Sequence, residues 1–406
     1  MYFDIVIVGN SAAGLSAVNT LRRYNQYSSI ALFDREDYPA YSRVSLPYYI
    51  VGKASRDKLF IVDPAFYERM GVNAFLGQEV AEINPLKKEI RTLQGLKCSY
   101  GKLFLGIGGE SKKTGLEQEK AERLRHLKDG DAIHSGIAEA KSVTGLGAGL
   151  VTVPLLSHLK EEMEKNLVIS SDRILSRVVE REASFLLEEE MAKKGVRLFK
   201  KDDVTKITAN GKLTLHLKSG NTILTDFLII GKGVEPNIEL AQKAGIEVDQ
   251  GIIVDGKMRT SAEDVYAGGD CAQGKDFITG KPVIQGNWFT AVEQGEAAAK
   301  SMLGLDFQYE GSLKHNITYI FGKEVAVVGY NREDAPFSYS YYNSKTGLYR
   351  CVFLDEKERL IGATLIGETD ESGIYYYLVK TRAKIPGGRL NRTLNYAKIL
   401  RALDFK

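Results

Sequence analysis

The chain has 406 residues, 44% of them hydrophobic and 26% charged, which is enough for about two or three globular domains. Its net charge of +3 is too small to indicate nucleic acid as a general partner. Cys98, Cys271 and Cys351 stand too far apart for a zinc ribbon or a local redox dithiol, and such sparse use favours a reducing cytoplasm. No basic segment precedes the first apolar run, so we expect no signal peptide.

The first predicted element is an apolar strand at 3–8 that enters a glycine-rich turn and continues into a helix. The turn, Gly9-Asn10-Ser11-Ala12-Ala13-Gly14, matches the pattern GxGxxG with Ser11 at the middle glycine. Gly9 permits a tight turn, Ser11 is small enough for close phosphate approach, and Gly14 lets the helix pack on the strand. A pyrophosphate would then bind the free N–H groups at the positive end of the helix dipole.

A second strand, 29–33, delivers Asp34 twenty residues beyond Gly14, where an acid accepts hydrogen bonds from a ribose diol. Strand, turn, helix, strand and acid together indicate a dinucleotide site, with NAD and FAD both open as ligands. Asp270, which follows two glycines at the end of another short strand, favours FAD because it can approach the ribityl chain closely. A helix N-cap is the alternative role for Asp270.

Residues 142–159 contain no formal charge and approach the length of a membrane span, but three glycines and Pro154 favour a buried strand that turns into a helix. The segment 141–165 thus repeats the strand, glycine turn and helix of the first site. Further apolar strands follow between 222 and 270, and tyrosine-rich alternating strands follow Gly304. This alternation of strands and helices predicts an α/β fold with no membrane span.

At this point the chain resembles the pyridine nucleotide-disulfide oxidoreductase superfamily. The nearest branch is that of NADH:rubredoxin reductases, the flavin part of assimilatory nitrite reductases, NADH oxidases and coenzyme A-disulfide reductases. The resemblance covers nearly the whole chain and rests on motifs in the family's order: Gly9–Gly14, Asp34, Tyr41-Ser42-Arg43, Gly147 and Gly149, 171–175, 231–237, and Thr260-Ser261 through Asp270-Cys271-Ala272.

The resemblance implies two Rossmann-like dinucleotide-binding domains and a small α+β C-terminal domain. The expected FAD-binding domain is discontinuous and comprises residues 1–109 and 226–311. The expected NAD(P)-binding domain comprises residues 110–225, and the C-terminal domain residues 312–406.

The resemblance also implies the cofactor contacts. Asp34 would bind the adenosine ribose, Asp270 the ribityl hydroxyls, Arg43 the flavin side, and Val80 the adenine through its backbone. The helix from Asn287 through Gly295 would point its N-terminus at the flavin. The full expected set is Gly9, Ser11, Ala12, Ala13, Gly14, Asp34, Arg35, Ser42, Arg43, Val80, Gly108, Gly269, Asp270 and Val292 for FAD, and Gly147, Gly149 and Gly233 for NAD(P), with no metal. Tyr48 and Trp288 are candidate flavin neighbours, and Trp288 has an alternative role in a domain core.

Three departures separate this chain from the family pattern. First, Val44 occupies the position of the redox cysteine, so disulfide or sulfenic acid chemistry is not expected there. Second, Thr152 replaces the third glycine of the second turn, and Ile169 stands where an acid should bind a ribose. Loss of that acid weakens the binding of NADH by about ten- to a hundredfold. Third, Tyr48 and Pro154 stand where the rubredoxin reductase branch has a lysine–glutamate pair.

The second departure leaves NADH and NADPH open, since Ser170, Ser171 and Arg173 would lie near a 2′-phosphate. We therefore expect the chain to hold FAD more securely than a nicotinamide nucleotide.

Two functions remain open. In the first, an enzyme passes electrons from NAD(P)H through the flavin to a separate acceptor, without a redox cysteine, general acid or metal. In the second, the chain is an FAD-carrying electron-relay or nucleotide-sensing subunit with a degenerate NAD site and no free dehydrogenase activity. The acceptor, the pathway and the oligomeric state are open, and a homodimer is compatible with the resemblance.

Residues 380–406 carry eight basic residues, Lys380, Arg382, Lys384, Arg389, Arg392, Lys398, Arg401 and Lys406, against one acid, Asp404. This basic tail is either a solvated helical face or a docking surface for a small acidic carrier such as rubredoxin or ferredoxin.

Overall fold

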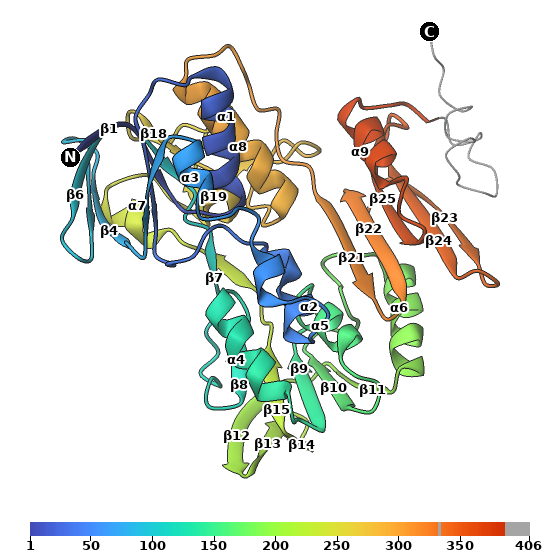
Figure 1. Ribbon diagram of the computed structural model, residues 1–406. Coiled ribbons are helices and arrows are strands. Elements are labelled where there is room, and N and C mark those ends of the chain that lie inside the picture. Colours follow the sequence, from blue (N-terminus) through green and yellow to red (C-terminus); the bar gives the residue numbers. More distant parts are fainter. Residues whose placement is uncertain (332–333, 386–406) are drawn as a thin grey trace. The chain divides into compact units, whose positions relative to one another are not determined.

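The computed structural model describes residues 1–331 and 334–385 (Figure 1). It divides into two compact units. The first unit comprises Met1–Ser42, Asp57–Glu110 and Glu235–Lys314. The second comprises Arg43–Arg56, Ser111–Val234 and the described part of His315–Lys406. Among the described residues, no helix combines the length and the apolar character needed to cross a bilayer.

The first unit is built on a sheet whose parallel strands lie in the order β3-β2-β1-β6-β18. Their bounds are β1 (Tyr2–Val8), β2 (Ile30–Asp34), β3 (Val72–Leu76), β6 (Lys97–Leu105) and β18 (Val265–Ala267). Antiparallel strands β4 (Val80–Asn84) and β5 (Glu89–Thr92) extend it. The unit also contains α1 (Ala12–Tyr24), α3 (Phe66–Arg69), α7 (Glu239–Lys243), α8 (Trp288–Met302), η3 (Gly269–Cys271), β17 (Ile252–Ile253), β19 (Ala272–Lys275) and β20 (Pro282–Val283).

From Ile5 to Val8, strand β1 is buried on both faces, as its apolar run predicts for a central parallel strand. Alternate residues enter hydrophobic clusters on opposite sides of the sheet, Ile5 and Ile7 on one side and Val6 and Val8 on the other. Helices α1 and α8 lie side by side over one face (Figure 1). A Cβ on Gly295 of α8 would lie only 2.2 Å from the carbonyl oxygen of Ala13, so this close helix packing requires the glycine.

The second unit repeats this architecture, with parallel strands in the order β11-β10-β9-β15-β8. The strands are β8 (Ala121–Arg123), β9 (Ser142–Leu146), β10 (Glu164–Ile169), β11 (Val196–Lys200) and β15 (Phe227–Ile230), and the antiparallel β12 (Val204–Asn210), β13 (Lys212–Leu217) and β14 (Thr222–Thr225) form a separate sheet. Its helices are η1 (Arg43–Ser45), α2 (Leu46–Ile50), α4 (Leu127–Ile137), α5 (Thr152–His158) and α6 (Arg181–Lys193). Three short elements lie at the unit boundaries: η2 (Arg56–Leu59), β7 (Gly109–Ser111) and β16 (Val234–Pro236). The uncharged segment 142–159 therefore forms β9 and α5, as expected.

The C-terminal part of the second unit is an antiparallel sheet in the order β21-β22-β25-β24-β23, with α9 (Ser372–Lys380) packed on β22 and β25. The strands are β21 (His315–Ile320), β22 (Lys323–Gly329), β23 (Phe337–Asn343), β24 (Leu348–Leu354) and β25 (Leu360–Gly367). The α/β fold class with two Rossmann-like domains is thus confirmed.

The compact units differ from the predicted domain boundaries in three main places, apart from shifts of a few residues at Glu110 and at 312–314. Residues 43–56 belong to the second unit, because α2 packs on α4 and α5. Residues 226–234 belong there too, because β15 pairs with both β9 and β8. The C-terminal sheet does not separate from the second unit, because polar groups join it to the start of α6. The Thr364 hydroxyl donates to the Glu180 carboxylate at 2.7 Å, and the Tyr349 hydroxyl to Glu182 at 3.2 Å.

Glu180 makes this connection pH-dependent. Burial raises the pKa of the Glu180 carboxyl, although hydrogen bonds from Thr364 and Tyr349 oppose the rise. A folded-state pKa above the ordinary value means that the unfolded chain loses this proton first, so stability falls as pH rises through the folded-state pKa. We expect Glu180→Gln to melt at a higher temperature than the parent protein at about pH 8, with the difference shrinking towards about pH 5. Thermal melts across this range check the prediction, and a pH-independent difference would contradict it.

Candidate functional site

The glycine-rich turn after β1 is held by backbone contacts that leave no room for side chains. Gly9 has φ +113°, and a Cβ there would lie 2.2 Å from the carbonyl oxygen of Gly106, which follows β6. A Cβ on Gly14 would lie 1.9 Å from the carbonyl oxygen of Gly9. The turn therefore lies at the carboxyl edge between β1 and β6, where parallel sheets bind nucleotides. Helix α1 starts at Ala12 with its first-turn N–H groups at this edge, as a pyrophosphate requires.

Asp34 ends β2 beside this turn. Its carboxylate accepts hydrogen bonds from the backbone N–H of Asn10 at 2.6 Å and of Glu36 at 2.8 Å. These bonds tie the acid directly to the glycine-rich turn. A carboxylate offers about four acceptor positions, so it can still accept from a ribose diol. The pairing of this turn with this acid fits the adenosine end of FAD.

Tyr67 of α3, which no sequence motif marks, supports the same turn. Its hydroxyl lies 2.7 Å from Nδ2 of Asn10 and accepts the backbone N–H of Ala40 at 3.0 Å. Asn10 also donates to the carbonyl of Tyr38 at 3.3 Å. Tyr67 is separated from Asn10 by 57 residues, and a lone tyrosine in an amphipathic segment carries no signal of this contact.

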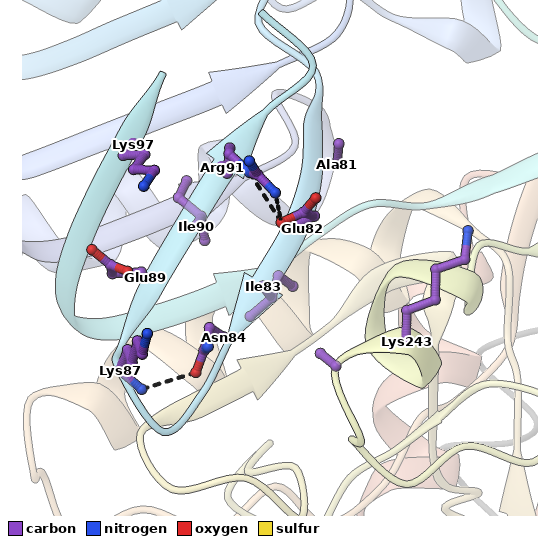
Figure 2. A pocket seen from close by; sticks show the side chains of 11 residues that line it. Ala81, Glu82, Ile83, Asn84, Lys87, Glu89, Ile90, Arg91, Lys97 and Lys243 are labelled. Carbon is purple, nitrogen blue, oxygen red and sulfur yellow. Dashed lines mark hydrogen bonds and ion pairs between the residues drawn. The ribbon is translucent and has the colours of Figure 1, made fainter. Parts of the chain in front are cut away.

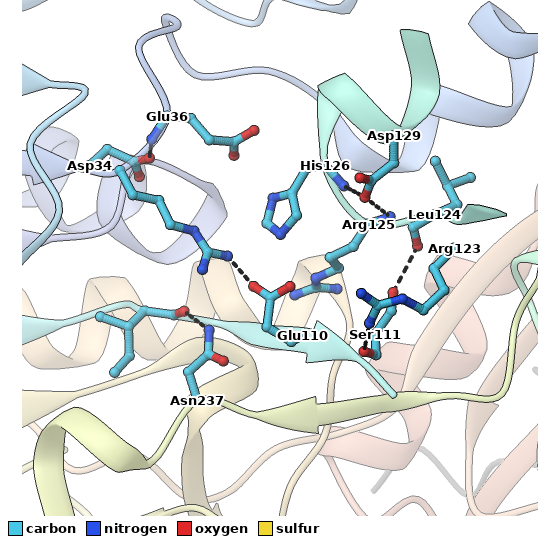
Figure 3. A network of polar contacts seen from close by, with 12 residues as sticks. Asp34, Glu36, Glu110, Ser111, Arg123, Leu124, Arg125, His126, Asp129 and Asn237 are labelled. Carbon is cyan, nitrogen blue, oxygen red and sulfur yellow. Dashed lines mark hydrogen bonds and ion pairs between the residues drawn. The ribbon is translucent and has the colours of Figure 1, made fainter. Parts of the chain in front are cut away.

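Arg35 and Gly108 follow β2 and β6, two strands of the same parallel sheet. The Arg35 guanidinium forms an ion pair with Glu110, a residue that no sequence motif marks and that is labelled in Figure 3. Gly108 has φ +64° and accepts the backbone N–H of Asn237 at 2.9 Å. The side chain of Asn237 donates to the carbonyl of Ile107 at 2.7 Å. Asn237 of the 231–237 motif thus holds the segment that follows β6 with two hydrogen bonds.

Gly269 and Asp270 form the third part of this site. Gly269 has φ +78° and donates its N–H to Gln294 of α8 at 2.8 Å. Asp270 lies inside η3, whose N-cap is Gly268, so it does not serve as a helix N-cap. The Cγ atom of Asp270 would lie 3.5 Å from a Cβ on Gly286, so Gly286 lies beside the Asp270 carboxyl group.

Helix α8 begins where the sequence predicts. Asn287 is its N-cap and accepts the N–H of Thr290 at 2.9 Å. Trp288 is half-buried and packs against a core cluster of the first unit, in line with its alternative role. The carbonyl of Val292 accepts the Ser16 hydroxyl at 2.7 Å, which couples α8 to α1.

The remaining expected FAD residues divide between the units. Val80 begins β4, and the Ser42 N–H donates to the carbonyl of Leu59 at 2.8 Å, both within the first unit. Arg43 and Tyr48 belong to the second unit. The Tyr48 ring lies 4.7 Å from the His158 ring, and Nδ1 of His158 lies 3.3 Å from the Lys53 ammonium. Burial, with the Lys53 charge, lowers the pKa of His158 to about 4.

The second glycine turn resembles the first at Gly147 but differs from it at Gly149 and Thr152. Gly147 has φ +119°, and a Cβ there would lie 2.2 Å from the carbonyl oxygen of Gly231. A Cβ on Gly149, however, would meet nothing within 4 Å. Thr152, at the place of Gly14, donates its hydroxyl to the carbonyl of Gly147. Gly233 has φ +102° and accepts the N–H of Lys112 at 3.0 Å.

The helix after the second glycine turn, α5, is also shorter than α1, the helix after the first. α5 has 7 residues and α1 has 13. α5 starts five positions after its first glycine, and α1 starts three positions after Gly9. The dipole of so short a helix is weaker, and its free N–H groups begin two positions further from the glycine than in α1, which supports the expectation of weaker nicotinamide nucleotide binding.

A pocket of about 390 Å³ lies apart from these turns, where β4, β5 and β6 meet α7 (Figure 2). Charged side chains surround it, and Arg91 pairs with Glu82 across the strands at 3.0 Å. Its lining contains none of the expected cofactor residues, so it adds nothing to this site. Residues 386–406 of the basic tail lie outside the described part of the chain.

Comparisons with known proteins agree with this geometry. The family model described as "Pyridine nucleotide-disulphide oxidoreductase" matches residues 3–297. The assimilatory nitrate reductase electron transfer subunit of Bacillus subtilis is 29% identical over 390 residues, which cover 93% of this chain and 49% of that protein. The rubredoxin-NAD(+) reductase of Pseudomonas putida is 30% identical, covering 74% of this chain and 80% of that protein. This chain thus spans about half the length of the first relative and most of the second.

Solved structures share the fold. Putidaredoxin reductase, in its covalent complex with putidaredoxin, has a TM-score of 0.92 at 21% identity, covering 99% of both chains. An NAD-dependent persulfide reductase from A. fulgidus has a TM-score of 0.88 at 25% identity, covering 98% of this chain and 80% of that chain. Enzymes of the matched family are NAD(P)H-dependent flavin oxidoreductases, which confirms the predicted cofactors, FAD and NAD(P)H. The chain belongs to the pyridine nucleotide-disulphide oxidoreductase family.

Proposed function

We propose that this protein is an FAD enzyme that takes electrons from NAD(P)H and passes them from the flavin to a separate small protein carrier, without a redox-active cysteine. The flavin supplies the conversion between hydride transfer and single-electron transfer. The observation that carries the proposal is the intact FAD-type site of the first unit, in a chain whose thiols are all buried. The contribution of the chain's own residues is to bind and orient the nucleotides.

The cysteines support direct electron transfer from the flavin. Cys98, Cys271 and Cys351 are all free and buried. Burial raises the pKa of Cys98 to about 11 and that of Cys271 to about 12, and it also raises the pKa of Cys351. Such thiols remain protonated and are poor nucleophiles. Val44, at the family's cysteine position, is 58% exposed and offers no thiol. Free buried thiols also suit a reducing compartment, and we place the enzyme in the cytoplasm.

Relatives favour a carrier protein as the acceptor. Their names describe an electron transfer subunit and a rubredoxin reductase, and one structural neighbour was solved bound to putidaredoxin. The second candidate function, an FAD-carrying relay or nucleotide-sensing subunit, is favoured by the short α5 and by Thr152 in the second turn. The two functions differ in one respect, which is whether a nicotinamide nucleotide reduces the flavin.

Anaerobic titration of the yellow holoprotein with NADH and NADPH separates them. We expect the visible flavin band to bleach within the time of a stopped-flow experiment with at least one nucleotide. Oxidised rubredoxin or ferredoxin should then restore the colour. A flavin that stays oxidised at roughly millimolar concentrations of both nucleotides, above usual KM values, would support the relay function instead.

Asp34→Asn should weaken FAD binding because the ribose loses a charged acceptor. A charge-assisted hydrogen bond contributes about 1.5–3 kcal/mol, so we expect the FAD dissociation constant to rise about ten- to a hundredfold. Fluorescence titration of FAD into apoprotein measures this constant. Asp4→Asn is the matched control, because Asp4 accepts from Ser29 within the same unit but stands near the start of β1. An equal loss in both variants would show that the effect is not specific to the ribose.

A thiol reagent tests the cysteine-free route. We expect N-ethylmaleimide to leave NAD(P)H-dependent reduction of the carrier unchanged in the folded holoprotein, since its thiols are buried and protonated. Mass spectrometry before and after brief unfolding verifies that the thiols react only when exposed. Inactivation in step with modification of one folded-state cysteine would refute this route.

A further inference from the structure

The two parallel sheets of this chain provide an internal comparison at the adenosine ribose position. Val8 pairs with Phe33 in the first unit, and Leu146 pairs with Val168 in the second. The next residues are Asp34 and Ile169. The backbone carbonyl of Asp34 accepts the N–H of Gln78 at 2.8 Å, and that of Ile169 accepts the N–H of Asp202 at 3.0 Å. Ile169 is fully buried, so no acid is present at this point of the second unit.

The same correspondence holds after the neighbouring strand, where Lys201 is the counterpart of Gly77. Gly77 donates its N–H to the carbonyl of Glu36 at 3.1 Å, and Lys201 donates to the carbonyl of Ser171 at 3.0 Å. Both donors have left-handed backbones, with φ +72° for Gly77 and +54° for Lys201. Glycine adopts this conformation without cost, whereas lysine is strained there.

The side chains at this edge form a cationic, hydroxyl-bearing surface. Ser170 and Lys201 are exposed. The hydroxyl of Ser171 already donates to the carbonyl of Arg173 at 2.8 Å, and the Arg173 side chain is only 13% exposed. Both residues are therefore less available to a ligand than the sequence suggested.

Acids near this edge are already paired with other cations. Asp172 pairs with Arg181 at 3.0 Å, Asp203 with Lys232 at 2.7 Å, and Glu188 with Lys200 at 2.6 Å. Within 1–331 and 334–385, Lys201 has no ion-pair partner. Its ammonium is thus a positive charge without an ion-pair partner there, on a residue whose backbone N–H bonds to Ser171, the chain neighbour of Ser170.

We infer that Lys201 and Ser170 bind the 2′-phosphate of NADPH, so that the second unit selects NADPH over NADH. The inference rests on the proposed function and names the preferred nucleotide. A lysine ammonium is a suitable point charge for phosphate, and the serine hydroxyl donates a hydrogen bond. The unphosphorylated ribose of NADH finds the buried Ile169 in place of an acceptor.

Calorimetry on the purified holoprotein tests this without turnover. The probes are adenosine 2′,5′-bisphosphate and adenosine 5′-monophosphate, which differ only in the 2′-phosphate. We expect the bisphosphate to bind about tenfold more tightly or better, as a charge-assisted contact implies. Lys201→Gly should remove most of this difference. The variant should fold normally because glycine relieves the left-handed strain, so an unchanged or higher melting temperature verifies its integrity.

Lys120→Gly is the matched control. Lys120 is another exposed lysine of the second unit with a left-handed backbone, at φ +66°. It should leave the preference for the bisphosphate intact. Ser170→Asp should weaken the bisphosphate selectively, because the added carboxylate faces the phosphate. Equal binding of the two probes, or a preference that Lys201→Gly does not alter, would overturn the inference.

Anaerobic flavin reduction shows whether the NADPH inference alone fails or the proposed function fails as well. We expect NADPH to bleach the flavin at about tenfold lower concentration than NADH, and Lys201→Gly to bring the two together. If both nucleotides bleach the flavin equally, the NADPH inference fails and the proposed function stands. If neither nucleotide bleaches it, the proposed function fails.

Discussion

The close approach of backbone to backbone at the glycine-rich turn is the constraint on which the first unit depends. The carbonyl of Gly106 lies where a Cβ of residue 9 would stand, and the carbonyl of Gly9 lies where a Cβ of residue 14 would stand. These contacts bring the end of β1, the end of β6 and the first turn of α1 to one edge. The Asn10 N–H then donates to Asp34. The turn expected to bind phosphate and the acid expected to bind ribose therefore lie together at that edge. Any side chain at Gly9 or Gly14 would separate them.

The second unit has the same sheet architecture, but the residues and the helix start at its glycine turn differ. Gly147 retains the close approach to Gly231, yet Thr152 satisfies the Gly147 carbonyl with its own hydroxyl and α5 starts late. An enzyme with the proposed function must release its nicotinamide nucleotide in every cycle and must keep its flavin. The asymmetry between the two turns suits those different demands, because bound lifetime follows the number and quality of the contacts.

The C-terminal sheet is integrated with the second unit through polar groups as well as apolar packing. Glu180 at the start of α6, Thr364 of β25 and Tyr349 of β24 form a buried cluster at this junction. Burial of a carboxyl is unfavourable unless it is hydrogen-bonded or protonated. This cluster therefore specifies one arrangement of α6 against the sheet, at some cost in stability at high pH.

The sequence alone determined the family, the α/β class and the FAD-type turn with Asp34, because glycine spacing and strand periodicity are local patterns. It also located Ile169 and Thr152 as departures. Only the tertiary structure decided which strands share a unit, how Tyr67 supports Asn10, and that Arg35 pairs with Glu110. It also revealed Lys201 as the counterpart of Gly77. These relations join residues far apart in the chain through sheet register and packing, which no local spacing encodes.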